Sequence, residues 1–101
     1  MAEQFFEQAA TDKRLVLLDF GADWCSTRRV VDRLLKGAWP GLDSRLLWVK
    51  VDIHQRPDLV ERFGVLSVPT VVILSPEEEV LWRKSGYFQV PELEAALPRA
   101  R

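Results

Sequence analysis

Residues 15–28 read LVLLDFGADWCSTR, and this stretch decides the fold. Its first six residues, 15–20, form a short and almost continuously apolar run, which is typical of a strand buried on both faces. The glycine and alanine that follow break this run. Over residues 25–36 the apolar positions recur at helical spacing. The stretch therefore predicts a buried strand that leads into an amphipathic helix.

The same patterns, followed outward along the chain, predict three further helices and three further strands. Helices are predicted at about residues 2–14, 25–36, 57–63 and 90–97, and strands at 15–20, 46–53, 70–74 and 80–84. Gly37 is predicted to end the second helix, and residues 37–44 to form a turn. The order α-β-α-β-α-β-β-α predicts an α/β fold in which helices flank both faces of a mixed four-stranded sheet.

Length and charge limit the number of domains and the class of partner. With 101 residues, 48% of them hydrophobic, we expect one domain over residues 1–101. Fifteen acidic and fourteen basic residues, scattered along the chain, give no electrostatic footprint for nucleic acid or for an anionic membrane. We expect a monomer whose partner is a protein or a small molecule.

Hydropathy bears on the membrane and on the compartment. The longest apolar runs, residues 15–18 and 71–74, are far shorter than the roughly 20 residues that a membrane-spanning helix needs. The opening MAEQFFEQAA has neither the basic start nor the apolar stretch of a secretory signal. We therefore expect a cytoplasmic protein, or a periplasmic one if an export signal was trimmed.

Cys25 is the single cysteine of the chain. A single cysteine excludes an internal disulfide and a cysteine-based metal cluster, and we expect neither a metal nor a bound cofactor. At a helix start, unpaired backbone N–H groups and the helix dipole favour the thiolate, the form that attacks disulfides. Arg28, one helical turn later, can place a guanidinium near the sulfur. The alternatives are a cysteine that acts as a small buried hydrophobe and an arginine that extends into water.

Motifs in three parts of the chain carry a resemblance to a known family. These are residues 19–25 (DFGADWC), residues 68–70 (VPT) and the glycine at position 86, which lies in the segment KSGY. Together they resemble the thioredoxin superfamily, and the chain looks most like the C-terminal domain of DsbD-type thiol:disulfide interchange proteins. The resemblance implies a single thioredoxin-like domain and a thiol–disulfide oxidoreductase.

Arg28 departs from the family pattern, in which this position holds a second, resolving cysteine. Cys25 then captures a disulfide partner but needs an external thiol, such as glutathione, for release. We expect monothiol exchange with protein or glutathione disulfides. The alternatives are a non-catalytic protein-binding module and a variant of a dithiol enzyme that has lost its resolving cysteine.

The resemblance also assigns further site residues. Asp19 falls at the family's buried acid and Lys50 at its lysine neighbour, so we expect Asp19 to be partly neutral or paired with Lys50. These two residues are either catalytic or a structural pair. The other assignments concern the substrate-binding surface, which the resemblance places at Trp24, Val68, Pro69 and Thr70, with Pro69 in the cis form. Trp39, Trp48 and Trp82 are expected to serve packing.

Overall fold

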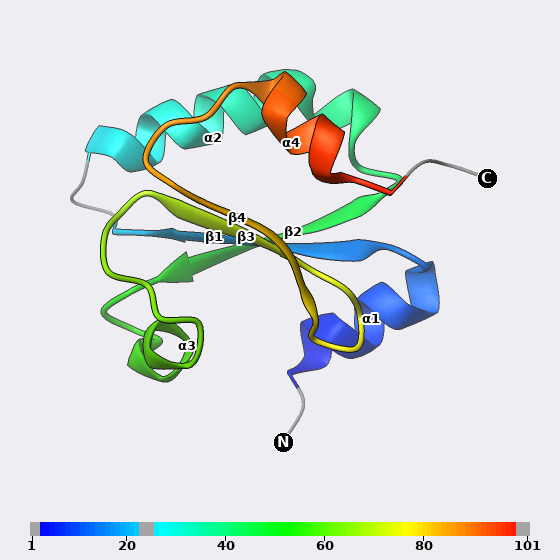
Figure 1. The fold of residues 1–101 in the computed structure, drawn as a ribbon, viewed down its shortest axis with the longest axis horizontal. Coiled ribbons are helices and arrows are strands. Elements are labelled where there is room, and N and C mark those ends of the chain that lie inside the picture. The colour runs from blue at the N-terminus through cyan, green and yellow to red at the C-terminus, as the bar shows by residue number, and fades with distance from the viewer. Residues whose placement is uncertain (1–2, 23–25, 99–101) are drawn as a thin grey trace.

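A mixed sheet with the strand order β2-β1-β3-β4 forms the centre of the fold (Figure 1). The structure is a computed structural model, and it describes residues 3–22 and 26–98. The strands are β1 (Leu15–Gly21), β2 (Leu46–Asp52), β3 (Thr70–Leu74) and β4 (Val80–Ser85). β1 is parallel to β2 and antiparallel to β3, and β4 is antiparallel to β3. The predicted α/β class and the mixed four-stranded sheet are confirmed.

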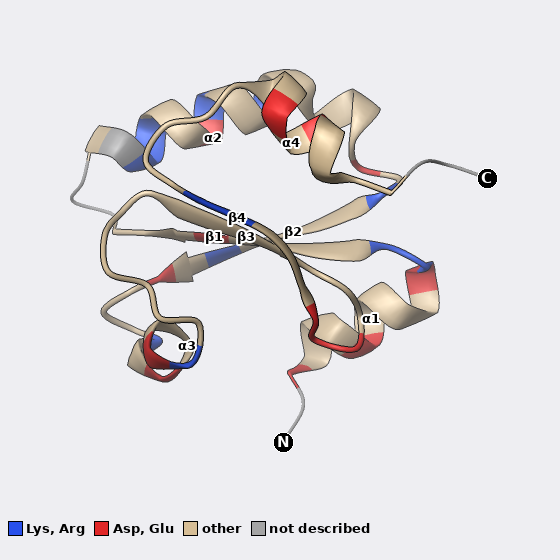
Figure 2. Cartoon of the chain, in the orientation of Figure 1, with Lys and Arg blue, Asp and Glu red and all other residues tan. Residues whose placement is uncertain are grey.

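Helices cover both faces of this sheet. They are α1 (Gln4–Asp12), α2 (Ser26–Ala38), α3 (Pro57–Arg62) and α4 (Val90–Ala96), with a short 3-10 helix η1 (Trp39–Gly41) after α2. Figure 1 shows α2 and α4 over one face and α1 and α3 over the other. Positively and negatively charged residues are scattered over the helices, strands and turns without a large region of one sign (Figure 2). No helix in residues 3–22 and 26–98 is long and apolar enough to cross a membrane.

The central strand β1 is buried on both faces, as its apolar run predicts. Because strand side chains alternate, Val16, Leu18 and Phe20 pack in the core beneath α1 and α3. Leu17 packs in the opposite core, beneath α2 and α4. Asp19 is two residues further along the same face as Leu17, so its carboxyl group lies between the sheet and α2.

The end of α2 differs from the sequence prediction. Gly37 was predicted to stop the helix, but α2 continues through it to Ala38 and passes directly into η1. A glycine ends a helix where the backbone turns left-handed, and Gly37 is not among the residues with positive φ. Gly64, by contrast, has a φ of +61° and does follow the end of α3. The residues after Gly37 thus continue helically until Leu42, which is buried in the core beneath α2 and α4.

Candidate active site at the start of helix α2

The expected nucleophile, Cys25, falls between β1 and α2 in the sequence. Cys25 and its neighbour Trp24 lie outside the described residues, so the site is built here from the residues on either side of them. β1 ends at Gly21 and α2 begins at Ser26. The carboxyl end of a strand in an α/β sheet is the edge where such folds place ligands and reactive groups.

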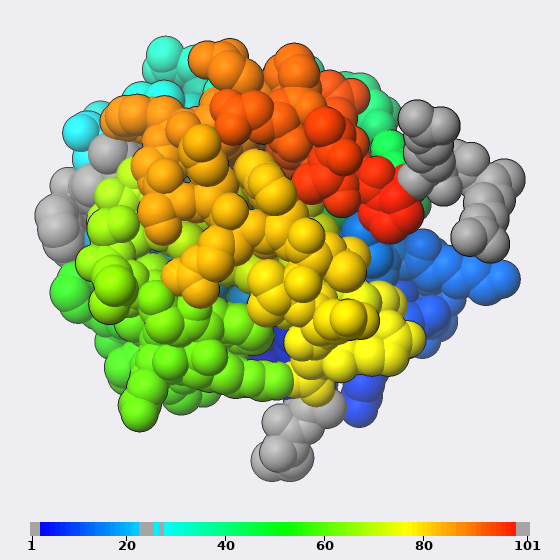
Figure 3. Space-filling view, viewed as in Figure 1, coloured from blue at the N-terminus to red at the C-terminus, as the bar shows by residue number. Residues whose placement is uncertain are grey.

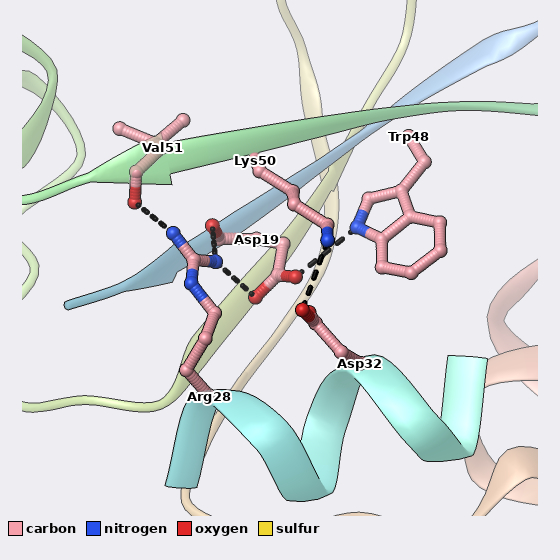
Figure 4. Close-up of polar contacts among 6 residues, drawn as sticks. All are labelled: Asp19, Arg28, Asp32, Trp48, Lys50 and Val51. Carbon is pink, nitrogen blue, oxygen red and sulfur yellow. Dashed lines mark hydrogen bonds and ion pairs between the residues drawn. The ribbon is translucent and has the colours of Figure 1, made fainter. Parts of the chain in front are cut away.

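Arg28 turns inward from the first turn of α2 and makes three polar contacts with the sheet (Figure 4). Its Nη1 donates to the backbone oxygen of Asp19 over 3.1 Å and lies 3.3 Å from the carboxylate Oδ1 of the same residue. Its Nη2 donates to the backbone oxygen of Val51 over 3.2 Å. Only 8% of Arg28 is exposed, so the alternative in which its side chain extends into water is wrong.

Gly21 provides the space that the guanidinium of Arg28 occupies. A Cβ atom placed on Gly21 would lie 3.0 Å from both Cζ and Nε of Arg28. Carbon atoms in proteins are ordinarily in contact at about 3.5–4.0 Å, so any side chain at position 21 would press on the guanidinium. The glycine at the end of β1 and the arginine in α2 therefore fit each other.

Asp19 is almost completely buried, with 1% of its surface exposed. Burial raises the pKa of its carboxyl group, because a charged form is poorly solvated in the interior. A hydrogen bond from Trp48 Nε1 to Oδ2, 3.1 Å long, and the positive charge of Arg28 oppose this rise in pKa. The ionised carboxylate thus accepts a hydrogen bond on Oδ2 and has a cation 3.3 Å from Oδ1, and both contacts lower the cost of burying its charge.

Lys50 does not form the expected ion pair with Asp19. The two residues face each other in the β1–β2 register, but the Nζ of Lys50 lies 2.9 Å from Oδ2 of Asp32 on α2. Lys50 is exposed, and its Nζ lies 4.9 Å from the centre of the Trp48 ring. The physical reason is that the guanidinium of Arg28 occupies the position next to the Asp19 carboxylate. The ammonium group of Lys50, which is more strongly hydrated, therefore pairs with Asp32 at the surface.

Trp48 is a functional-site residue that the sequence analysis assigned to packing alone. It does pack, since the centre of its ring lies 5.1 Å from that of Trp39, but its indole N–H also donates a hydrogen bond to the carboxylate of Asp19. The available signal was its spacing: Trp48 lies two residues before Lys50, on the same face of β2. A buried indole also usually needs an acceptor for its N–H group.

Three of the four expected substrate-binding residues, Val68, Pro69 and Thr70, lie where the chain enters β3. The Val68–Pro69 peptide bond is cis, and the backbone N–H of Gly86 donates to the carbonyl oxygen of Pro69 over 2.8 Å. Thr70 is fully buried, and its hydroxyl contacts the Ser67 carbonyl oxygen at 2.7 Å and the Ser85 hydroxyl at 3.0 Å. The side chain of Thr70 therefore braces this segment from inside, whereas Val68 is half-buried at the surface.

An apolar hollow of about 220 Å³ adjoins this segment. It lies between the end of β2, α3 and the chain before Pro69, and its lining consists of Ile53, Val60, Val65, Leu66, Ser67 and Val68. Leu66, at the edge of this hollow, is 96% exposed. In Figure 3 the chain after β4, in orange, lies beside the green segment that contributes to this region. The described residues include no group of three or more side chains that could hold a metal ion.

Comparison with known proteins agrees with this architecture. The family model described as Thioredoxin matches residues 1–97. The thioredoxin of Listeria monocytogenes is 36% identical over 92 residues, which cover 91% of this chain and 87% of that protein. Thioredoxin 1 of Chlorobaculum tepidum is 31% identical over 86 residues, with coverages of 85% and 84%.

Solved structures give the same result for the fold. A mutant thioredoxin from Halobacterium salinarum superposes with a TM-score of 0.76 at 23% identity, over 96% of this chain and 83% of that one. A structure titled as thioredoxin-2, a component of malaria parasite protein secretion machinery, has a TM-score of 0.73 at 26% identity, with coverages of 81% and 79%.

The chain belongs to the thioredoxin family. Family membership supports thiol–disulfide oxidoreduction as its general chemistry. The sequence contains one cysteine, Cys25.

Proposed function

We propose that this protein is a thioredoxin-like thiol–disulfide oxidoreductase that acts through the single nucleophile Cys25. The observation that carries the proposal is that position 28 holds an arginine and not a second cysteine. Arg28 stands there, held on Asp19 and Val51 by its guanidinium, and the chain has no other thiol. A mixed disulfide on Cys25 therefore has no internal group to resolve it.

The proposed exchange takes two steps. The thiolate of Cys25 attacks one sulfur of a disulfide R–S–S–R′, which forms Cys25–S–S–R and releases R′S⁻. An external thiolate, for which glutathione is the candidate, then attacks the sulfur of R. This step forms a disulfide between R and the external thiol and returns Cys25 as the thiolate. No bound cofactor takes part, and the electrons come from the external thiol.

The segment before β3 supports a peptide as the substrate. In this proposal an extended chain pairs with the backbone of Val68. The apolar hollow next to Val68 offers a place for an apolar side chain of that substrate. Trp24, which precedes Cys25 in the sequence, is proposed to line the same surface.

Asp19 and Lys50 enter this proposal in different ways. Asp19 lies beneath the start of α2 and influences it through Arg28. Lys50 is tied to Asp32 at the surface and is a less direct participant. The likeness to DsbD-type proteins rests on sequence motifs, while the relatives described above are thioredoxins. That subtype, a cytoplasmic or periplasmic location, and a monomeric state remain proposals.

A protein-binding module without turnover is a second candidate, favoured by the exposed Leu66 beside the hollow. The two candidates differ in what happens when Cys25→Ser removes the thiol. The exchange proposal expects the reaction with glutathione disulfide, followed by mass spectrometry, to disappear, and the wild-type thiol to react faster than free cysteine at pH 7. A binding module keeps its partner in a pull-down with the Cys25→Ser variant.

The variant-enzyme alternative has its own experiment, which is to restore the cysteine. Arg28→Cys is assayed for reduction of a protein disulfide beside the wild type and Arg29→Cys, which places the same thiol one residue away. A large gain with Arg28→Cys alone favours descent from a dithiol enzyme. Equal activity in all three proteins contradicts it.

A further inference from the structure

We propose that Arg28 is a positioning residue that closes Asp19 into a buried ion pair, so that this carboxyl group does not exchange protons with Cys25. The inference rests on the proposed function, in that Cys25 is taken as the reactive group. It adds a specific consequence, namely that the thiol titrates alone. The inference assigns the guanidinium of Arg28 to its contacts with β1 and β2.

The polar contacts of Asp19 carry the first step. Oδ1 faces the Arg28 guanidinium at 3.3 Å, and Oδ2 accepts the indole N–H of Trp48 at 3.1 Å. Neither donor can give up its proton near neutral pH, because guanidinium and indole N–H groups stay protonated. Protonation of this carboxyl group would therefore remove the negative charge that faces Arg28, in a place where 1% of the residue is exposed.

The charges around Asp19 carry the second step. From α2 it faces Arg28 and Asp32, and from β2 it faces Lys50. Asp32 and Lys50 neutralise each other at 2.9 Å, and the β3 neighbour Val71 is apolar. Arg28 is thus the cation left to balance Asp19.

Gly21 carries the third step. The guanidinium lies where a Cβ of residue 21 would be 3.0 Å away, and it also bonds the backbone of both β1 and β2. An arginine with a fitted space and acceptors on two strands is built into the site. Because it belongs to the first turn of α2, it also fixes the start of the helix that follows Cys25 in the sequence.

The test is the pH dependence of Cys25 alkylation by iodoacetamide, measured from pH 4 to pH 9. We expect the wild type to follow one ionisation, and Asp19→Asn to keep that single step even if its midpoint moves. Arg28→Met removes the counter-charge, so Asp19 and Cys25 should titrate as a coupled pair and the curve should acquire a second step. The double variant Asp19→Asn/Arg28→Met should return to one step. Arg29→Met, an exposed arginine beside Arg28, is the matched control and should keep one step.

Two results overturn the proposal. One is a two-step wild-type curve that Asp19→Asn reduces to one step, since Asp19 then exchanges protons with the thiol despite Arg28. The other is a folded Arg28→Met variant that keeps a single step. If circular dichroism shows that Arg28→Met does not fold, the wild type and Asp19→Asn decide, together with the carboxyl ¹³C shift of Asp19 in the wild type. That shift should not follow the ionisation of Cys25, and a shift that does follow it overturns the proposal.

These measurements do not depend on disulfide exchange. Alkylation reports the ionisation of the thiol whether or not the protein reacts with glutathione disulfide. If the protein does not exchange disulfides but gives the expected alkylation curves, the proposed function is wrong and the proposed role of Arg28 stands. If the protein exchanges disulfides but its alkylation curves differ from those expected, only the proposed role of Arg28 is wrong.

Discussion

Gly21 and Arg28 fit together so closely that a methyl group on the first would lie 3.0 Å from the guanidinium carbon of the second. The guanidinium cannot withdraw freely, because it is bonded to the backbone of Asp19 and Val51. We therefore expect Gly21→Ala to lower the free energy of unfolding by about 1–3 kcal/mol, the usual cost of overpacking. Urea denaturation measures this loss.

Gly37→Ala is the control for that substitution. Nothing lies within 4 Å of a Cβ at Gly37, which is inside α2. Alanine there should stabilise the protein by up to about 1 kcal/mol, since glycine is a poor helix former. Gly21→Ala should also cost much less in an Arg28→Met background. An equal cost in both backgrounds would show that the close contact with Arg28 is not its cause.

Arg28 and Lys50 should differ strongly in their contributions to stability. Arg28→Met leaves a buried carboxylate without its cation, for which losses of about 3–5 kcal/mol are typical, reduced here to the extent that Asp19 takes up a proton. Lys50→Met removes an ion pair in which the lysine side chain is 44% exposed, so a loss below about 1 kcal/mol is expected. Thermal and urea unfolding of both variants compare them. If Lys50→Met proves the more damaging, the pairing seen here is not the one that stabilises the protein.

Asp19 predicts a pH dependence of stability with a definite sign. The fold raises the pKa of Asp19 above its ordinary value of 3.8, mainly by burial. Between these two values the folded protein holds a proton that the unfolded chain has lost, so the free energy of unfolding falls as pH rises through this window. The fall amounts to about 1.4 kcal/mol for each tenfold gain in proton affinity.

The measurement is the difference in unfolding free energy between the wild type and Asp19→Asn, followed from pH 4 to pH 7. Exposed carboxyl groups whose pKa is lowered, those of Asp12, Asp58 and Glu92, act in the opposite direction. They are present in both proteins and cancel in the difference. A difference that grows with pH would mean that Arg28 and Trp48 outweigh burial and lower the pKa of Asp19.

Leu66 should matter for partner binding and not for stability. Its side chain is 96% exposed, so Leu66→Ser should change the free energy of unfolding by less than about 0.5 kcal/mol. If the hollow beside Val68 holds an apolar side chain of the partner, the same substitution should weaken binding of a disulfide-containing peptide several-fold, measured by calorimetry. Leu81→Ser, at an exposed leucine on β4, is the control. Equal binding by both variants would remove the hollow from the substrate surface.

Strand positions could be predicted from the sequence because they depend on local composition. β3 spans Thr70–Leu74 as predicted, since five consecutive β-branched and aliphatic residues are bounded by proline on one side and a polar loop on the other. The C-terminal end of α2 was harder to predict from the sequence. Gly37 can be accommodated in a helix or can stop one, and the burial of Leu42, which lies further along the chain, favours the helical path.

The site depends on relationships that no local pattern contains. The sequence placed Asp19 on a buried strand and Arg28 one turn into a helix, and both positions are confirmed. Their contact, however, requires the space above Gly21 and the acceptor on Val51, which come from two strands. Lys50 was paired with Asp19 from its family position alone, and the choice between Asp19 and Asp32 depends on which cation is less costly to bury.

The fit between Gly21 and Arg28 constrains how this protein can change by mutation. An exchange of Arg28 for a smaller residue would leave a void above Gly21 and a carboxylate without its cation, while a larger residue at position 21 would displace the arginine first. Either substitution alone, at position 21 or at position 28, is therefore expected to give a less stable protein. The two positions therefore depend on each other, and a change to a second thiol at position 28 would remove the cation that balances Asp19.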